Sequence, residues 1–141
     1  MTIASRKKLI TRVSAFKRWF TKTVPNKAVR LDVWRALYRH GEVVPIPPSL
    51  CGLPVDEQIS RGVVACFGGW LTASPMYHTY KEGGSAHSEF MGNTDGLRFK
   101  GNGAHLFSGR CNKRVGEKRE VLDRIETVLR YHRKKVKEAR A

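Results

Sequence analysis

Apolar residues recur at helical spacing in the first segment of the chain. They stand three or four positions apart, at Leu9, Ile10, Val13, Phe16 and Phe20. This period places them on one face of a helix, with the basic residues of the segment around the rest of its perimeter. Pro25 predicts the end of the helix, because proline has no amide donor and restricts the residue before it.

The last segment carries a second and longer helical pattern. Its apolar stripe comprises Val121, Leu122, Ile125, Val128, Leu129, His132 and Val136. Acidic residues are concentrated early in this segment and basic residues late, an order that favours a helix because it complements the helix dipole. We therefore expect amphipathic helices at both ends of the chain.

A further helix is predicted between Asn26 and about Arg39. Asn26 is a suitable N-cap, and Gly41 is a natural stop. The apolar face of this helix would be formed by Val29, Val33 or Trp34, and Leu37. Four of the six prolines follow within residues 42–54, which predicts a stiff, extended connector.

The centre of the chain holds the best candidate for a buried element. Apolar residues run from Ile59 to Leu71 and alternate with small residues, which predicts a central helix that other backbone segments can approach closely. A buried strand through residues 62–67 is the competing interpretation. Residues 73–112 are rich in turn signals, and a minor β-hairpin within 76–107 would use residues 76–80 and 97–100.

Together these patterns predict a mainly α fold, or an α+β fold if the hairpin forms. We expect one compact domain over residues 1–141. It comprises a basic helical segment (1–40), a neutral centre rich in glycine and proline (41–112) and a basic C-terminal helix (113–141). The two terminal helices would pack their apolar stripes on the buried central helix and turn their basic faces outward.

Charge is distributed unevenly along the chain. Residues 1–40 contain eleven basic residues and one acid, residues 41–109 contain four basic and six acidic residues, and residues 110–141 contain twelve basic and five acidic residues. The net charge of +15 favours a polyanionic partner, because self-repulsion of this size is relieved by neutralisation. The residues predicted to contact the phosphate backbone of DNA or RNA are Arg6, Lys7, Lys8, Arg12, Lys17, Arg18, Arg30, Arg133, Lys134, Lys135 and Lys137.

Four ring-bearing residues lie among the basic residues of the first segment: Trp19, Trp34, Tyr38 and His40. They have two interpretations, stacking on unpaired bases or packing inward. We expect the aromatics to pack in the core, because such residues at helical spacing usually do. The sequence has no zinc-finger spacing and no other recognisable base-reading module, so binding would be largely independent of nucleic-acid sequence.

Catalysis and metal binding find little support in the sequence. The three cysteines and five histidines are scattered and form no metal-binding doublet, so we predict no metal, no cofactor and no catalytic residues. The least favoured function is a small nuclease or hydrolase. It would require the convergence of His78, His87 or His105 with Glu89 or Asp95.

Features of targeting are absent from the sequence. No apolar run approaches the length needed to span a bilayer, and the basic N-terminus is not followed by the hydrophobic stretch of a secretory signal. Cys51, Cys66 and Cys111 are an odd number at wide spacing, which fits reduced thiols. These features predict a cytoplasmic protein without a membrane partner.

Three short elements resemble a group of small uncharacterised proteins of tailed bacteriophages. The elements are Cys51-Gly52, the run from Ala65 to Leu71 with its cysteine, glycines and tryptophan, and a later Leu97 with Leu106-Phe107. The resemblance covers about residues 30–108 and implies a compact accessory protein of a phage, located in the host cytoplasm, with no catalytic residues to transfer. The alternative function is an inhibitor or adaptor that docks on an acidic host protein through its positive charge.

Overall fold

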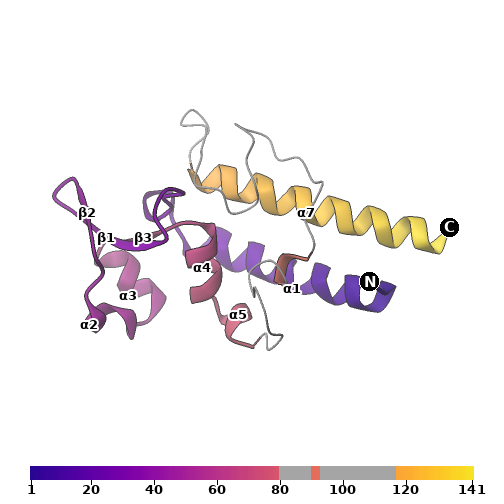
Figure 1. The fold of residues 1–141 in the computed structure, drawn as a ribbon, viewed down its shortest axis with the longest axis horizontal. Coiled ribbons are helices and arrows are strands. Elements are labelled where there is room, and N and C mark those ends of the chain that lie inside the picture. The colour runs from indigo at the N-terminus through magenta and orange to yellow at the C-terminus, as the bar shows by residue number, and fades with distance from the viewer. Residues whose placement is uncertain (80–89, 93–116) are drawn as a thin grey trace.

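Two long helices lie side by side along one side of the molecule, with shorter elements packed beside and beyond them (Figure 1). This architecture is that of a computed structural model, and it describes residues 1–79, 90–92 and 117–141. The helices are α1 (Ile3–Thr23) and α7 (Glu117–Arg140). Both amphipathic helices predicted from the terminal segments are therefore confirmed.

Helix α1 forms because its apolar period matches the helical repeat. Thr2 caps the helix by accepting a hydrogen bond from the Ser5 amide, and the chain becomes extended at Val24, directly before Pro25. The buried residues of α1 are Leu9, Val13, Phe16 and Phe20. Each buried side chain of this size stabilises the fold by roughly 1.5–3 kcal/mol, so this stripe is a major part of the core.

Helix α7 buries the other predicted stripe. Its buried apolar residues are Val121, Ile125, Val128, Leu129 and Val136, and His132 is buried among them. The first turn carries Glu117 and Glu120, and the last turn carries Lys137 and Arg140, so the charges complement the helix dipole at both ends.

The predicted helix between Asn26 and Arg39 is wrong. A single 3₁₀ turn, η1 (Asn26–Ala28), is followed by strand β1 (Arg35–Arg39), which pairs with β2 (Glu42–Val44) in an antiparallel hairpin. The turn between them is formed by His40 and Gly41, whose φ angles are 51° and 80°. Left-handed φ at both positions is typical of a two-residue hairpin turn, so Gly41 reverses the chain and does not end a helix.

Residues 59–71 are divided among three elements where the sequence predicted one helix. The segment contains β3 (Val63–Ala65) and α4 (Phe67–Ala73), preceded by α3 (Val55–Ser60). The break lies at Gly62, which has a φ of 97° and whose added Cβ would lie 2.7 Å from the Tyr38 carbonyl oxygen. The buried small-residue helix is thus confirmed as α4, and the competing strand is realised as β3.

Strand β1 lies between β2 and β3 in a three-stranded antiparallel sheet. Leu37 is paired with Val63 on one neighbour and with Val44 on the other. Leu37, Val63 and Ala65 belong to the same buried cluster as the stripes of α1 and α7, so sheet and helices share one core. The fold is mainly helical with a small sheet, as the sequence predicts.

Two short helices lie where the sequence predicted extended structure. Helix α2 (Pro48–Cys51) and strand β2 lie in the segment 42–54 that was expected to be an extended connector. Helix α5 (Pro75–Thr79) includes Met76, so the first predicted strand of the 76–107 hairpin is helical through residue 79. The second predicted strand, residues 97–100, lies outside the described residues.

Candidate nucleic-acid interface

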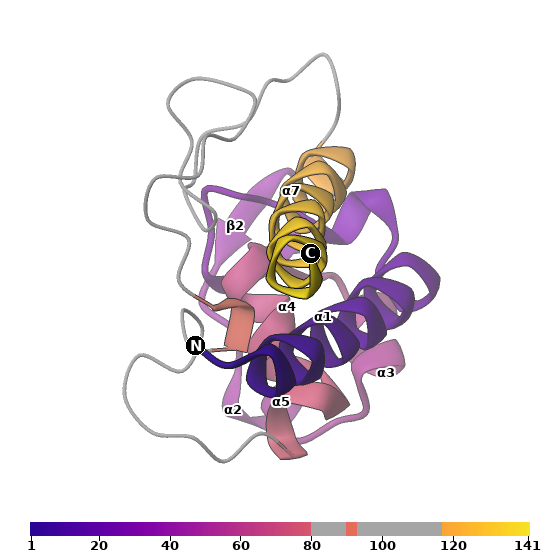
Figure 2. The ribbon, with the colours of Figure 1, turned by 90° about the vertical axis from the view of Figure 1, so that its right-hand side faces the viewer.

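Three contacts set the direction of the two long helices. Arg6 of α1 donates to His132 of α7 at 2.8 Å, and Lys17 forms an ion pair with Glu126 at 2.5 Å. Near the other end, the Lys118 ammonium donates to the Thr21 carbonyl at 3.0 Å. Contacts further along α1 are therefore made with earlier residues of α7, so the two helices are antiparallel. Figure 2 shows α7 nearly end-on and α1 at an angle to it, with both termini at the near end.

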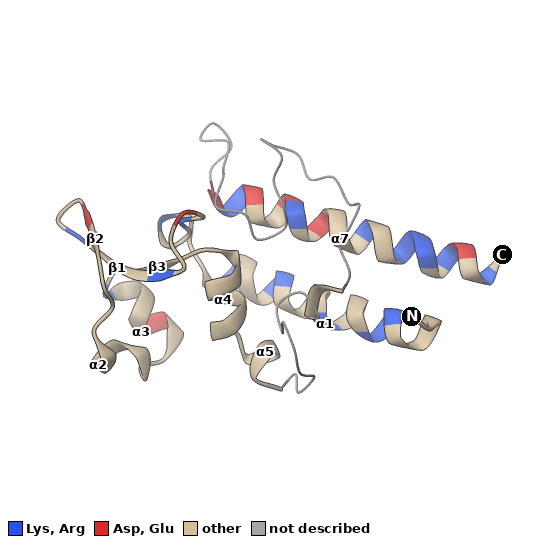
Figure 3. Ribbon diagram, viewed as in Figure 1, with Lys and Arg blue, Asp and Glu red and all other residues tan. Residues whose placement is uncertain are grey.

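The antiparallel pairing divides the helix pair into two halves of different charge (Figure 3). The terminal half comprises residues 3–12 and 127–140 and contains ten basic residues and one acid, a net charge of +9. The inner half comprises residues 13–23 and 117–126 and contains six basic and four acidic residues, a net charge of +2. Two segments far apart in the sequence thus join their excess positive charge at one end.

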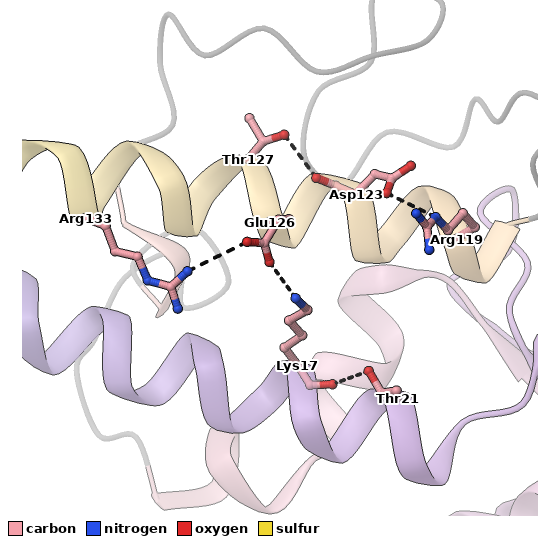
Figure 4. Close-up of polar contacts among 7 residues, drawn as sticks. All are labelled: Lys17, Thr21, Arg119, Asp123, Glu126, Thr127 and Arg133. Carbon is pink, nitrogen blue, oxygen red and sulfur yellow. Dashed lines mark hydrogen bonds and ion pairs between the residues drawn. The ribbon is translucent and has the colours of Figure 1, made fainter.

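Ion pairs neutralise most of the inner half. Glu126 contacts Lys17 across the helix pair and lies 3.7 Å from Arg133, while Asp123 lies 3.3 Å from Arg119 on the same helix (Figure 4). Behind them, Glu120 and Arg124 form a buried pair at 3.3 Å. The charges of this half are therefore used largely to hold α7 and to join it to α1.

The hydrogen bond from Lys17 lowers the pKa of Glu126 below 4.5. The positive charges of Lys17, Arg133 and Arg130 lower the pKa further, while partial burial opposes them. Glu126 consequently remains ionised at neutral pH and keeps both cations engaged.

Several of the residues predicted to contact phosphate have partners within the fold. Besides Arg6 and Lys17, the Arg12 guanidinium donates to the Phe90 carbonyl at 2.8 Å and lies over the Phe90 ring. Arg30 is 3.5 Å from Asp32 and lies over the Tyr38 ring. The expectation that these basic faces point wholly outward is therefore wrong for these residues.

The other predicted contact residues are exposed on the two helices. Lys7, Lys8 and Arg18 are exposed on α1, and Lys137 is exposed on α7. Lys134, at 76% side-chain exposure, and Lys135 share a single acid, Glu138. All of these except Arg18 lie in the terminal half. The structure thus brings together Lys7, Lys8, Arg133, Lys134, Lys135 and Lys137 at one end of the helix pair.

Two exposed arginines of this surface were not among the predicted contact residues. Arg130 and Arg140 lie on the exposed side of α7 in the terminal half. Both lie outside the apolar stripe, and the helical period alone could have identified them. Lys22, near the end of α1, was also missed. It lines a surface hollow of about 750 Å³ together with Arg18, Trp19 and Arg133.

A buried histidine connects the two helices inside the terminal half. The His132 side chain is 1% exposed, and its Nδ1 accepts from Arg6, so the ring carries its proton on Nε2. Burial lowers the pKa of His132 below 6.5, and the charges of Arg6 and Arg12 lower it further, while the backbone of Met91 acts in the opposite direction. The ring is therefore neutral at physiological pH.

The aromatic residues divide between core and surface. Trp19 is half-buried against the core, as predicted, with its ring centroid 6.0 Å from that of Phe16. Trp34 and Tyr38 are 56% and 44% exposed, so the expectation that they pack in the core is wrong. The strand at residues 35–39 explains the difference, because side chains alternate between its two faces.

The residues considered for metal or catalytic chemistry are not assembled in the described part of the chain. Cys66 is buried and Cys51 exposed, both with free thiols, and His78 is at the end of α5. Within residues 1–79, 90–92 and 117–141, no group of three or more His, Cys, Asp or Glu side chains is placed to hold a metal. His87, Glu89, Asp95, His105 and Cys111 lie outside the described residues.

Comparison with known proteins yields no relative. A scan of family models, a search of curated proteins and a search of solved structures each found no match. In the described part of the chain, no helix combines the length and apolar character required to cross a bilayer.

Proposed function

We propose that this protein is a non-enzymatic nucleic-acid-binding protein that contacts the phosphate backbone with little regard to sequence. The observation that carries the proposal is the terminal half of the helix pair, where ten basic residues stand against one acid. Such a surface gains affinity from every counterion that its lysines and arginines release from the nucleic acid.

The composition of the terminal half explains why a polyanion suits it better than a small anion. Its exposed cations are carried by both helices, which lie side by side. A linear chain of phosphates can extend across both helices and releases counterions at each of them. We include an accessory role in a phage or a bacterial cell in the proposal, on the basis of the resemblance of residues 30–108.

The test compares two double variants of equal charge. Lys7→Gln/Lys8→Gln removes two cations of the terminal half, and Lys27→Gln/Arg61→Gln removes two exposed cations of η1 and the α3 end. Binding of a fluorescent oligonucleotide is measured by anisotropy over a range of salt concentrations. We expect wild-type affinity to fall steeply with salt, and the first variant to reduce the slope by about 0.7–0.9 for each phosphate that it no longer neutralises.

The control variant should keep the slope of the wild-type protein. Equal slopes for the two variants would contradict the assignment of the interface to the helix pair. No binding at low salt would contradict nucleic-acid binding itself. In that case, retention of one stoichiometric acidic protein from nuclease-treated lysate would favour the adaptor function.

A further inference from the structure

The outer face of the sheet carries exposed aromatic side chains. Ala36 and Tyr38 alternate with Leu37 in β1 and so share one face of the strand, and the exposed Trp34 directly precedes it. Val43, which is 42% exposed, is paired with Tyr38 across the hairpin. Leu37 alternates with them and packs in the core. Within the described residues, the face opposite Leu37 is buried at Ala36 and its partner Val64 and is exposed at Tyr38 and Val43, with Trp34 exposed just before the strand.

Trp34 is held in place by the two glycines of α4. A Cβ added to Gly68 would lie 2.7 Å from Cζ3 of Trp34, and one added to Gly69 would lie 2.1 Å from the Trp34 carbonyl oxygen. Both glycines thus leave space that Trp34 occupies, its ring over Gly68 and its backbone against Gly69. An exposed indole that is packed in this way is already ordered, so a ligand stacking on it loses little conformational entropy on binding.

A guanidinium group lies next to the second aromatic residue. Arg30, which is also 3.5 Å from Asp32, has its guanidinium 5.5 Å from the centroid of the Tyr38 ring. An aromatic ring with an adjacent guanidinium suits a nucleobase and the phosphate beside it, because every base has a face for stacking and every linkage has a charge.

We propose that Trp34 and Tyr38 stack on unpaired bases, so that the protein binds single-stranded nucleic acid in preference to duplex. The inference rests on the proposed function and deepens it. The two residues are four positions apart, about 13 Å along an extended chain, so each ring takes a separate base. The helix pair then binds phosphates, and the sheet face distinguishes a strand with accessible bases from one without.

Abasic nucleic acid separates the two contributions. Anisotropy titrations at fixed salt use a single-stranded oligothymidylate of about 12 nucleotides, within the range of typical single-strand sites, and a fully abasic strand with the same number of phosphates. We expect the wild-type protein to bind the thymidine strand at least about tenfold more tightly. Trp34→Leu and Tyr38→Leu each reduce this ratio, whereas Trp34→Phe and Tyr38→Phe retain most of it because they keep the ring.

Two controls exclude loss of folding or of charge as the cause. Trp19→Phe replaces a half-buried tryptophan of α1 and should leave the ratio unchanged, and Lys7→Gln/Lys8→Gln should weaken both strands equally. In the Trp19→Phe background, the thymidine strand should quench the fluorescence of Trp34 and the abasic strand should not, because Trp70 is fully buried.

The outcomes distinguish this inference from the proposed function. Equal, salt-dependent affinity for both strands overturns base stacking and leaves phosphate binding in place. An unchanged ratio in folded Trp34→Leu and Tyr38→Leu overturns the assignment to these residues. No affinity for either strand at low salt overturns the proposed function together with the inference.

Discussion

The inner and terminal halves of the α1–α7 pair use the same types of charged residue in opposite ways. In the inner half, Lys17, Arg119 and Arg124 each have an acidic partner within 4 Å. In the terminal half, Glu138 is the one acid, and six basic residues of α7 lie on the same stretch, residues 127–140. A count of charge along the chain does not distinguish these roles. The folded positions do, because Arg119 and Arg124 meet acids one turn away on α7 and Lys17 meets Glu126 across the helix pair.

Glu120→Gln should produce the largest effect and confine it to stability. The substitution leaves the buried Arg124 guanidinium without its carboxylate, so the free energy of unfolding should fall by about 3 kcal/mol in urea denaturation followed by circular dichroism. Asp123→Asn is the matched control, since its ion pair with Arg119 is exposed and should be worth less than about 0.5 kcal/mol. Equal losses of stability for the two variants would refute the structural role of the buried pair.

The stability of the terminal half should depend on pH through His132. The folded pKa is lowered, so as pH falls below about 6.5 the unfolded imidazole binds a proton before the folded one does. The free energy of unfolding should therefore decrease as pH is lowered from 6.5 to the folded pKa of His132. Below that pKa, His132 should cause no further change. Denaturation at a series of pH values measures the effect.

His132→Gln is the control for this pH dependence. Glutamine accepts a hydrogen bond from Arg6 but does not titrate, so the slope between pH 6.5 and the folded pKa of His132 should disappear. A variant that keeps the slope of the wild-type protein would show that another group causes it.

The ion pair between Lys17 and Glu126 should have the smallest effect. Both side chains are partly exposed, so a double-mutant cycle with Lys17→Met and Glu126→Gln should give a coupling of about 0.5 kcal/mol. Because the folded pKa of Glu126 is lowered, this stabilisation is present above pH 4.5 and is lost as pH falls through the folded pKa. A coupling that persists after the carboxyl is protonated would contradict the ionic origin.

The sequence predicted the long helices well and the short elements poorly. Helices α1 and α7 repeat the helical period over 21 and 24 residues, so local pattern and final packing agree. In residues 26–39 the spacing of Val29, Val33 and Leu37 fits a helix. The buried positions Val29, Leu31 and Leu37 also fit a two-residue period. Pairing with β3 favours the strand over the helix. Because β3 is distant along the chain, this contact cannot be predicted from the local sequence pattern.

The candidate interface was predictable in its charge but not in its geometry. The sequence identifies the basic residues, and seven of those predicted to contact phosphate are exposed, Lys7 and Lys8 among them. It does not reveal that Arg6 bonds to His132 or that Arg12 bonds to the Phe90 carbonyl, because these partners are 126 and 78 residues away. The exposure of Trp34 likewise follows from a strand that the sequence analysis did not predict.

An NMR titration tests the central claim most directly. Amide shifts of the ¹⁵N-labelled protein are followed as a single-stranded oligonucleotide is added at low salt. If the terminal half binds phosphates, the largest shifts on the helix pair should fall on residues 3–12 and 127–140 and reverse when salt is raised. Shifts that leave these residues unchanged while residues 13–23 and 117–126 respond would contradict the account.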